Sequence, residues 1–208
     1  MTNHAQSIAP LADVSRETVD RLCLFEQLIR KWNPTINLVS KSSLNDVWMR
    51  HIADSAQLYK HIPDGVVKCV DLGSGGGLPG IVLAAISVDQ SPERHFTLVE
   101  SDQRKAAFLR EAVRTLGINA AIIAQRAETL EPQGAELVSA RALAPLSKLL
   151  TAAQRHLAKD GVCLFPKGEN FAHEIDEAKH QFEFECKTVQ SLTDPSGVIL
   201  IVHGIRNA

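Results

Sequence analysis

The chain has 208 residues, of which 45% are hydrophobic and 22% charged, with a formal net charge of -2. This length predicts one domain with room for a small extension, and the composition excludes disordered and fibrous proteins. No apolar run reaches the roughly 18 residues of a membrane span, and the first residues lack a basic-then-apolar leader, so we expect a soluble cytoplasmic protein without a membrane partner. The net charge excludes attraction of the whole molecule to nucleic acid, so any such binding must be local.

The cysteines and histidines show no metal-site pattern. The four cysteines lie far apart without C-x-x-C spacing and among apolar neighbours, which predicts buried, reduced thiols at Cys23, Cys69, Cys163 and Cys186. His173 and His180 are too far apart along one expected helix to share a metal, and a solvated helical face explains them. We therefore expect no bound metal ion.

Helical periodicity dominates the first part of the chain. Apolar residues recur every three or four positions over 19–32, which predicts a helix that begins near Ser15 and ends at the Asn33-Pro34 pair. A second stripe over 44–59 predicts another helix, ended by a Pro-Asp-Gly turn. We interpret residues 1–64 as an N-terminal helical extension.

From residue 66 onward, short β-branched runs alternate with amphipathic segments, which predicts a parallel sheet with crossover helices. The expected strands lie at about 66–71, 95–100, 120–124, 135–140 and 162–166, and the expected helices at about 78–88, 102–116, 145–158 and 169–180. Two further strands, 182–189 and 198–202, flank an Asp-Pro-Ser-Gly turn and predict a terminal antiparallel hairpin. Seven strands with the last one antiparallel predict an α/β fold of the class I methyltransferase type over residues 65–208, a Rossmann-like sheet distinct from a six-stranded dehydrogenase domain.

The most informative motif is Asp71-Leu72-Gly73-Ser74-Gly75-Gly76-Gly77-Leu78-Pro79-Gly80, between the first strand and the first crossover helix. Glycines permit φ > 0 and a close backbone approach to a ligand, and the following helix offers unpaired N–H groups. The spacing of Gly75, Gly77 and Gly80 also fits the dinucleotide fingerprint. A nicotinamide-dependent oxidoreductase is therefore an alternative.

Two residues favour S-adenosylmethionine as the cofactor. Asp71 precedes the glycines, where a carboxylate would repel a pyrophosphate but could hold the ammonium of a methionine moiety. Pro79 removes one N–H that a phosphate could have used. Glu100 ends the second strand about 25 residues after Gly75, close to the spacing at which an acid binds ribose hydroxyls, and it fits either cofactor.

Further motifs extend over nearly the whole chain. They are Lys31-Trp32-Asn33, Ile36-Asn37-Leu38, Arg50-His51-x-x-Asp54-Ser55, Arg104-Lys105-x-x-Phe108-Leu109-Arg110, Arg126-x-Glu128, Ser139-x-Arg141-Ala142 and Lys167-Gly168. Together with the glycine motif, this combination resembles the bacterial 16S ribosomal RNA guanine-N7 methyltransferase family, also called glucose-inhibited division protein B.

The resemblance implies a cofactor site and a substrate. It implies that Gly73 and Leu78 line the S-adenosylmethionine pocket, that Ala127 and Glu128 border the adenine, and that Arg141 reaches the cofactor near its reacting end. Gly75 and Gly77 complete the cofactor residues that we predict. The implied partner is 16S ribosomal RNA, alone or in a small ribosomal subunit particle, and we expect a monomeric enzyme.

The segment after the fourth strand, residues 139–144, limits which kinds of methyl acceptor the enzyme could use. It lacks the Asn/Asp-Pro-Pro-aromatic element typical of enzymes that methylate exocyclic amines, and Cys163 lies in an apolar strand without an activating neighbour. Guanine N7, the atom that the resemblance implies, carries a lone pair and no proton, so positioning is sufficient for transfer. We therefore predict no catalytic acid, base or nucleophile.

Local positive charge suggests where RNA could bind. Residues 141–167 contain five basic residues and one acidic residue, although such a run is often only a solvated face. We predict that Asn37, Arg50, His51 and Lys167 contact RNA, with a surface ion pair and a core imidazole as the alternative for Arg50 and His51. A non-catalytic RNA-binding module with a vestigial nucleotide pocket is the second alternative function.

Overall fold

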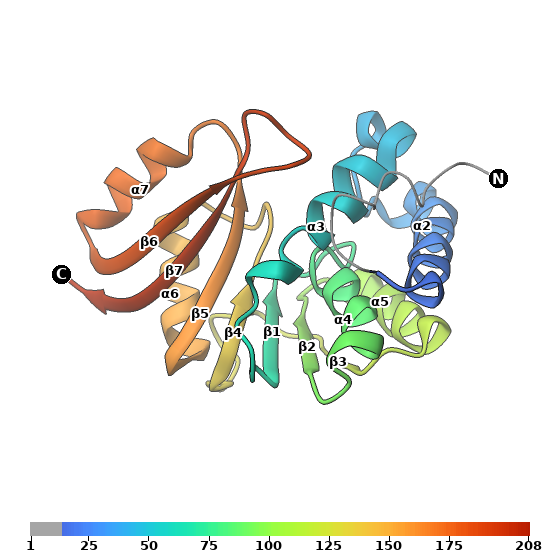
Figure 1. Cartoon of the computed structure of the whole chain (residues 1–208), viewed down its shortest axis with the longest axis horizontal. Coiled ribbons are helices and arrows are strands. Elements are labelled where there is room, and N and C mark those ends of the chain that lie inside the picture. Colours follow the sequence, from blue (N-terminus) through green and yellow to red (C-terminus); the bar gives the residue numbers. More distant parts are fainter. Residues whose placement is uncertain (1–13) are drawn as a thin grey trace.

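The computed structural model describes residues 14–208, which form a seven-stranded sheet with helices on both faces (Figure 1). The strands are β1 (Lys68–Leu72), β2 (His95–Val99), β3 (Ala120–Ile123), β4 (Ala135–Ser139), β5 (Leu157–Lys167), β6 (Phe182–Gln190) and β7 (Val198–Asn207). Their order is β3-β2-β1-β4-β5-β7-β6, and β7 runs antiparallel to both of its neighbours. The predicted class I methyltransferase sheet, with its last strand antiparallel, is confirmed.

Buried apolar residues pack on both faces of this sheet. The main helices are α2 (Arg16–Ile36), α4 (Gly80–Gln90), α5 (Gln103–Leu116), α6 (Leu146–His156) and α7 (Phe171–Lys179). Cys69 of β1 belongs to the cluster that includes α2, α4 and α5, and the next residue, Val70, belongs to the cluster of α6 and α7. This alternation follows from the two-residue period of a strand that is covered on both sides.

Helix α2 begins where the sequence predicts and ends later. Ser15 caps it by accepting a 3.0 Å hydrogen bond from the backbone N–H of Thr18. The expected end at the Asn33-Pro34 pair is wrong, because the helix continues to Ile36 with Pro34 inside its last turn. A proline so near the end removes only one helical hydrogen bond, and Asn37, with φ 48, then stops the helix.

The predicted second helix is also corrected. Its range contains four short pieces instead of one continuous helix, namely η1 (Lys41–Asp46), the π-helical η2 (Trp48–Ala53), α3 (Asp54–Ala56) and η3 (Tyr59–His61). The stripe itself is buried, as Trp48, Ile52 and Ala56 show. An apolar period of three to four residues does not distinguish 3₁₀, α and π turns, so the pattern found the buried face and missed the irregular backbone.

The N-terminal extension packs on the methyltransferase sheet. Phe25 of α2 stacks on Phe108 of α5 with ring centroids 6.4 Å apart, and Trp32 meets the same ring at 5.8 Å. The described part of the extension therefore shares one core with the sheet, while residues 1–13 lie outside the described chain. The division into 1–64 and 65–208 stays a prediction.

The cysteines, the possible membrane spans and the possible metal ligands were also compared with what the sequence predicts. All four cysteines are free, and Cys69 and Cys163 are buried, but Cys23 and Cys186 are only half-buried because they lie on an outer helix and on the edge strand β6. Within residues 14–208, no helix is long and apolar enough to cross a membrane. No group of three or more His, Cys, Asp or Glu in this part of the chain is placed to hold a metal ion.

Candidate active site

The loop between β1 and α4 has the backbone that its glycines predicted. Gly73, Gly75 and Gly77 have φ of 62°, 53° and 82°, in the left-handed region that residues with a Cβ rarely adopt. A Cβ at Gly73 would clash with the side chain of Leu143, which shows how closely the segment after β4 approaches the loop. The loop is therefore a tight backbone cradle at the carboxyl end of β1.

A cavity of about 590 Å³ opens beside this loop. The predicted cofactor residues that line it are Gly73, Gly75, Leu78, Glu100, Ala127, Glu128 and Arg141. The loop, the end of β2, residues 125–128 and residues 141–144 thus meet around one space of the size that small-molecule ligands occupy. We call it the first cavity.

Several lining residues were missed by the sequence argument. Leu38, from the Asn-Leu motif, lies over the loop, and its carbonyl oxygen would be 3.1 Å from a Cβ at Gly76. Lys105, Arg126 and Lys148 place three cations around the same cavity. The Arg-Lys and Arg-x-Glu motifs contain two of these cations, but only the fold shows that α5, the loop after β3 and α6 bring them together.

Glu100 has a double role at the cavity wall. Its Oε2 accepts a 2.8 Å hydrogen bond from the backbone N–H of Gly75, and its Oε1 accepts one of 2.7 Å from the backbone N–H of Asp102. The residue is only 8% exposed. Glu100 therefore fixes the glycine loop, and each carboxylate oxygen keeps a second lone pair that a ribose hydroxyl could use.

Replacing Glu100 with Ala is expected to weaken S-adenosylmethionine binding by about 1–3 kcal/mol, because a partly desolvated carboxylate acceptor is lost. Calorimetric titration with the cofactor measures this change. The matched control is Glu136→Ala, since Glu136 also accepts two backbone N–H bonds, from Val67 and Lys68, but at the opposite end of β1. Equal affinities of the two variants would remove Glu100 from the site.

Asp71 does not line the first cavity. It is fully buried, and Ser139 Oγ donates a 2.6 Å hydrogen bond to its Oδ1. Its other oxygen would be 2.7 Å from a Cβ at Gly80, so the carboxylate lies against the start of α4. Burial raises the pKa of Asp71 to about 6, although the hydrogen bonds from Ser139 and other donors oppose this shift. Asp71 thus supports the base of the loop, and its contact with the cofactor ammonium stays a prediction.

The raised pKa of Asp71 predicts a pH-dependent stability. Because the folded pKa of about 6 exceeds the ordinary value of 3.8, the contribution is fully present below about pH 4 and is lost as the pH rises through about 6. Between pH 4 and 7 the wild type is expected to lose about 2–2.5 kcal/mol of unfolding free energy relative to Asp71→Asn. Urea unfolding of both proteins from pH 4 to 7 measures the difference, and parallel pH curves would contradict it.

Gly77 also lies away from the first cavity. A Cβ there would lie 2.5 Å from Cγ1 of Ile81 and 3.1 Å from Cζ of Phe25. This glycine therefore lets α2 and α4 pack against the loop. Its direct contact with a cofactor stays a prediction, and the structure assigns it a packing role that spacing alone did not suggest.

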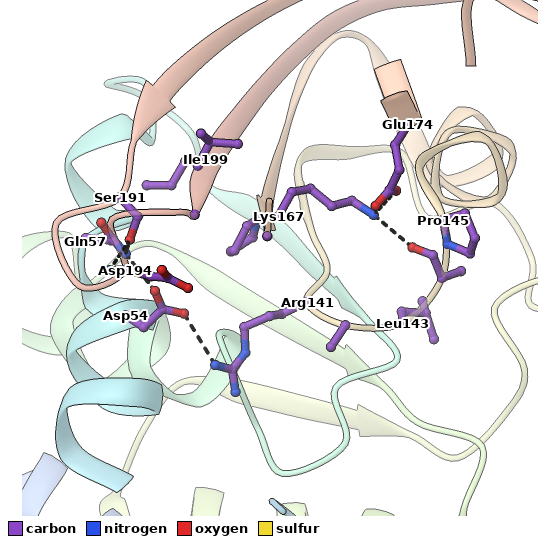
Figure 2. Close-up of a pocket in the computed structure, with 16 residues that line it drawn as sticks. Asp54, Gln57, Arg141, Leu143, Pro145, Lys167, Glu174, Ser191, Asp194 and Ile199 are labelled. Carbon is purple, nitrogen blue, oxygen red and sulfur yellow. Dashed lines mark hydrogen bonds and ion pairs between the residues drawn. The ribbon is translucent and has the colours of Figure 1, made fainter. Parts of the chain in front are cut away.

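A second cavity, of about 460 Å³, is shown in Figure 2 and lies next to the first. The two cavities share residues 141–144 as a common wall. Lys167 lines the second cavity, but its Nζ donates hydrogen bonds of 2.9 Å to the carbonyl of Ala144 and 2.7 Å to Oε2 of Glu174. The lysine side chain is 9% exposed, so its charge is largely satisfied within the protein, and its contact with RNA stays a prediction.

The other predicted RNA residues, Asn37, Arg50 and His51, line neither cavity. Asn37 and Arg50 are exposed. His51 Nε2 lies 2.8 Å from Ser43 Oγ, and burial, with Arg141 and Arg50 nearby, lowers its pKa to about 4. His51 is therefore a neutral, partly buried imidazole at pH 7, which fits the core alternative, and its contact with RNA stays a prediction.

Arg141 is placed between the two cavities. Its Nη1 donates to the carbonyl oxygen of Arg50 at 3.2 Å and lies 3.4 Å from Oδ2 of Asp54 (Figure 2). The side chain is 17% exposed. Arg141 thus ties the segment after β4 to the N-terminal extension.

The strand order and the left-handed glycine loop, with an acid at the end of the next strand, define a class I S-adenosylmethionine-dependent methyltransferase. Solved structures support this class of fold. The fibrillarin/Nop5p complex matches with a TM-score of 0.56 and 17% identity over 74% of this chain and 81% of that one. M. jannaschii TYW2 in complex with AdoMet matches with a TM-score of 0.53 and 15% identity over 76% of each chain. At such identities the likeness shows the fold alone.

Sequence comparisons give the particular family. Residues 18–199 match the family model described as rRNA small subunit methyltransferase G. The protein of that name from Rhodospirillum centenum is 55% identical over 187 residues, which cover 90% of this chain and 84% of the relative. The one from Cereibacter sphaeroides is 52% identical over 202 residues, 96% of each chain. The chain belongs to the rRNA small subunit methyltransferase G family, which decides against the oxidoreductase and the non-catalytic module.

Proposed function

We propose that this enzyme transfers the methyl group of S-adenosylmethionine to N7 of a guanosine in 16S ribosomal RNA. The observation that carries the proposal is the wall shared by the two cavities, residues 141–144, which offers a guanidinium and three apolar side chains and no group that could remove a proton. N7 needs no proton removed, so such a wall suits it. We place the enzyme in the cytoplasm because its proposed substrate is ribosomal RNA, and we infer a monomer because both cavities are formed within one chain.

The residues of the first cavity fit the cofactor. When bound, S-adenosylmethionine supplies a methyl group activated by a sulfonium. The glycine loop provides a cradle that a Cβ at Gly73 would fill, and Glu100 provides a carboxylate suited to ribose hydroxyls. Ala127 and Glu128 would border the adenine. These residues bind and orient, and none of them has to exchange a proton.

The positive charge of Arg141 has to be offset for this reaction. Methylation at N7 leaves a positive charge on guanine, and an unpaired guanidinium nearby would oppose that charge. Asp54 lies 3.4 Å from Nη1 of Arg141, and its negative charge offsets the guanidinium. The pair keeps Arg141 as part of the wall while reducing its repulsion of the product.

Cations around the first cavity would hold the RNA. Arg126 and Lys148 are exposed, and Lys105 is half-buried beside them. Contacts between such side chains and phosphates release counterions and leave base recognition to the cavity. In our proposal, these three cations take the role in phosphate binding for which Lys167 was predicted from the sequence.

The test of the proposed function is a map of N7-methylguanosine in 16S ribosomal RNA. Cells without this protein should lack one modified guanine that returns when the gene is restored. A naked 16S transcript and a small-subunit particle, each incubated with the purified enzyme and cofactor, identify the accepted substrate. An unchanged map in the deficient strain would contradict the proposal.

The proposed chemistry predicts a methyl-transfer rate that is flat between pH 7 and 8. N7 and the sulfonium do not titrate in this range, the pKa of His51 is about 4, and Asp71, with a pKa of about 6, is already ionised. Single-turnover rates at saturating substrate check this expectation. A bell-shaped profile in the same window would indicate acid–base catalysis and a different target atom.

A further inference from the structure

The second cavity lies where an acceptor base is needed. In a direct transfer, N7, the methyl carbon and the sulfur lie in line, so the base must occupy space that adjoins the cofactor cavity. The second cavity does so across residues 141–144, and Leu143 of that wall lies against Gly73 of the glycine loop. Its volume of about 460 Å³ is within the usual range of small-molecule sites.

Most charged groups of the second cavity are already engaged by protein partners. Asp54 accepts hydrogen bonds from three side chains, one of them that of Arg141. Glu174 accepts from the ammonium of Lys167 and from a backbone N–H at the start of α6. These groups shape the cavity, and a ligand would have to compete with their partners.

Asp194 differs from these residues because only one of its two carboxylate oxygens is engaged by protein donors. It lies on the turn between β6 and β7, and its Oδ1 accepts hydrogen bonds from the backbone N–H of Ser196 at 2.9 Å and from Ser196 Oγ at 2.7 Å. These bonds hold the pKa of Asp194 below its usual range, so it is ionised at neutral pH. The carboxylate is exposed and points into the cavity (Figure 2). The turn thus presents an oriented anion to whatever occupies this space.

The edges of guanine match this arrangement. One edge carries the acceptors N7 and O6, and another carries the donors N1–H and the N2 amino group. When N7 faces the cofactor cavity, the donor edge faces the walls of the second cavity that lie away from residues 141–144. A carboxylate accepts from two neighbouring donors, whereas adenine has no such pair of donors at these positions.

We propose that the second cavity binds the target guanine and that Oδ2 of Asp194, the oxygen that Ser196 leaves free, accepts hydrogen bonds from its N1–H and N2 amino group. Asp194 is then a specificity-determining residue, because it favours guanine over bases that lack this donor pair. The inference rests on the proposed function and adds the base-binding subsite to it.

The experiment compares guanosine with inosine, which keeps N7, O6 and N1–H but lacks the N2 amino group. Small-subunit particles are reconstituted with 16S ribosomal RNA that carries either nucleoside at the methylated position. Single-turnover rates are measured for the wild type, Asp194→Asn and the control Asp176→Asn. The amide introduced by Asp194→Asn can keep its oxygen toward Ser196, and Asp176 is an exposed acid on α7, paired with Lys179, that lines neither cavity.

The wild type and Asp176→Asn should prefer guanosine about 10- to 100-fold, and Asp194→Asn should reduce this preference to about threefold or less. Cofactor affinity should stay unchanged in Asp194→Asn, which shows that the variant folds. An equal loss on both substrates, or no preference in the wild type, would overturn the role of Asp194 while the proposed function stands. A wild type that methylates no guanine in the particle would overturn both.

Discussion

Replacing Gly77 with Ala should lower the free energy of unfolding by about 2–5 kcal/mol and abolish measurable cofactor binding. Two costs add here. The φ of 82° is unfavourable for a residue with a Cβ, by about 1–2 kcal/mol. The new methyl would also lie 2.5 Å from Ile81 and 3.1 Å from Phe25, both fully buried, and overpacking of this kind costs about 1–3 kcal/mol. Relief of the clash must displace the loop or α2, and either movement alters the first cavity.

The control for this prediction is Gly117→Ala. Gly117 has a similar φ of 61° at the end of α5, but a Cβ there has no atom within 4 Å. This variant therefore measures the backbone cost alone, about 1–2 kcal/mol, and should bind cofactor normally. Urea unfolding and calorimetry of both variants separate the two costs. If Gly77→Ala lost no more stability than Gly117→Ala, the assigned packing role of Gly77 would be wrong.

The comparison of Gly77 with Gly73 shows what sequence could predict about the loop. Both glycines were predicted to bind cofactor, because spacing identifies a turn that approaches a ligand. Spacing does not show which side of the turn faces the ligand and which faces the core. Gly73 faces the first cavity, whereas Gly77 faces Phe25, a residue more than fifty positions earlier in the chain.

The strands were predictable for a different reason. Most strands combine apolar residues, several of them β-branched, between turn residues, so the seven strands and the terminal hairpin could be located from local pattern. The bounds were less accurate, because β5 begins at Leu157, inside the predicted helix 145–158, and β7 continues to Asn207. The segment over 44–59 could not be resolved in this way. The turn η1, which leads into this segment, depends on local bonds such as that from the backbone N–H of Ser43 to Ser40 Oγ, 3.3 Å long, which apolar periodicity does not report.

Charge was the least predictable property of the site. Lys167 and Glu174 are seven positions apart across the end of β5 and the start of α7, and their contact neutralises a lysine that looked free in the sequence. Lys105, Arg126 and Lys148 come from three separate elements, so only the tertiary structure gathers them. Net charge over residues 141–167 therefore included one of these three cations, Lys148, and missed the other two.

The ion pair between Arg141 and Asp54 is expected to affect the rate of methyl transfer. Asp54→Asn should lower the single-turnover rate about 10- to 100-fold, equivalent to about 1.4–2.7 kcal/mol, and leave cofactor affinity within about twofold. The amide keeps an oxygen for Gln57 and Thr193, which bond Oδ1, but it loses the negative charge beside Arg141. The guanidinium would then oppose the charge that develops on guanine.

Thr193→Val is the matched control, because it removes the 2.6 Å hydrogen bond to Oδ1 of Asp54 and keeps the carboxylate charge. It should change the rate less than about threefold. A double-mutant cycle with Arg141→Gln then measures the coupling. The loss in the double variant should be smaller than the sum of the two single losses in free energy, because Asp54→Asn does harm mainly through an unpaired Arg141. Strictly additive losses would mean that Asp54 supports the fold without offsetting the charge of Arg141.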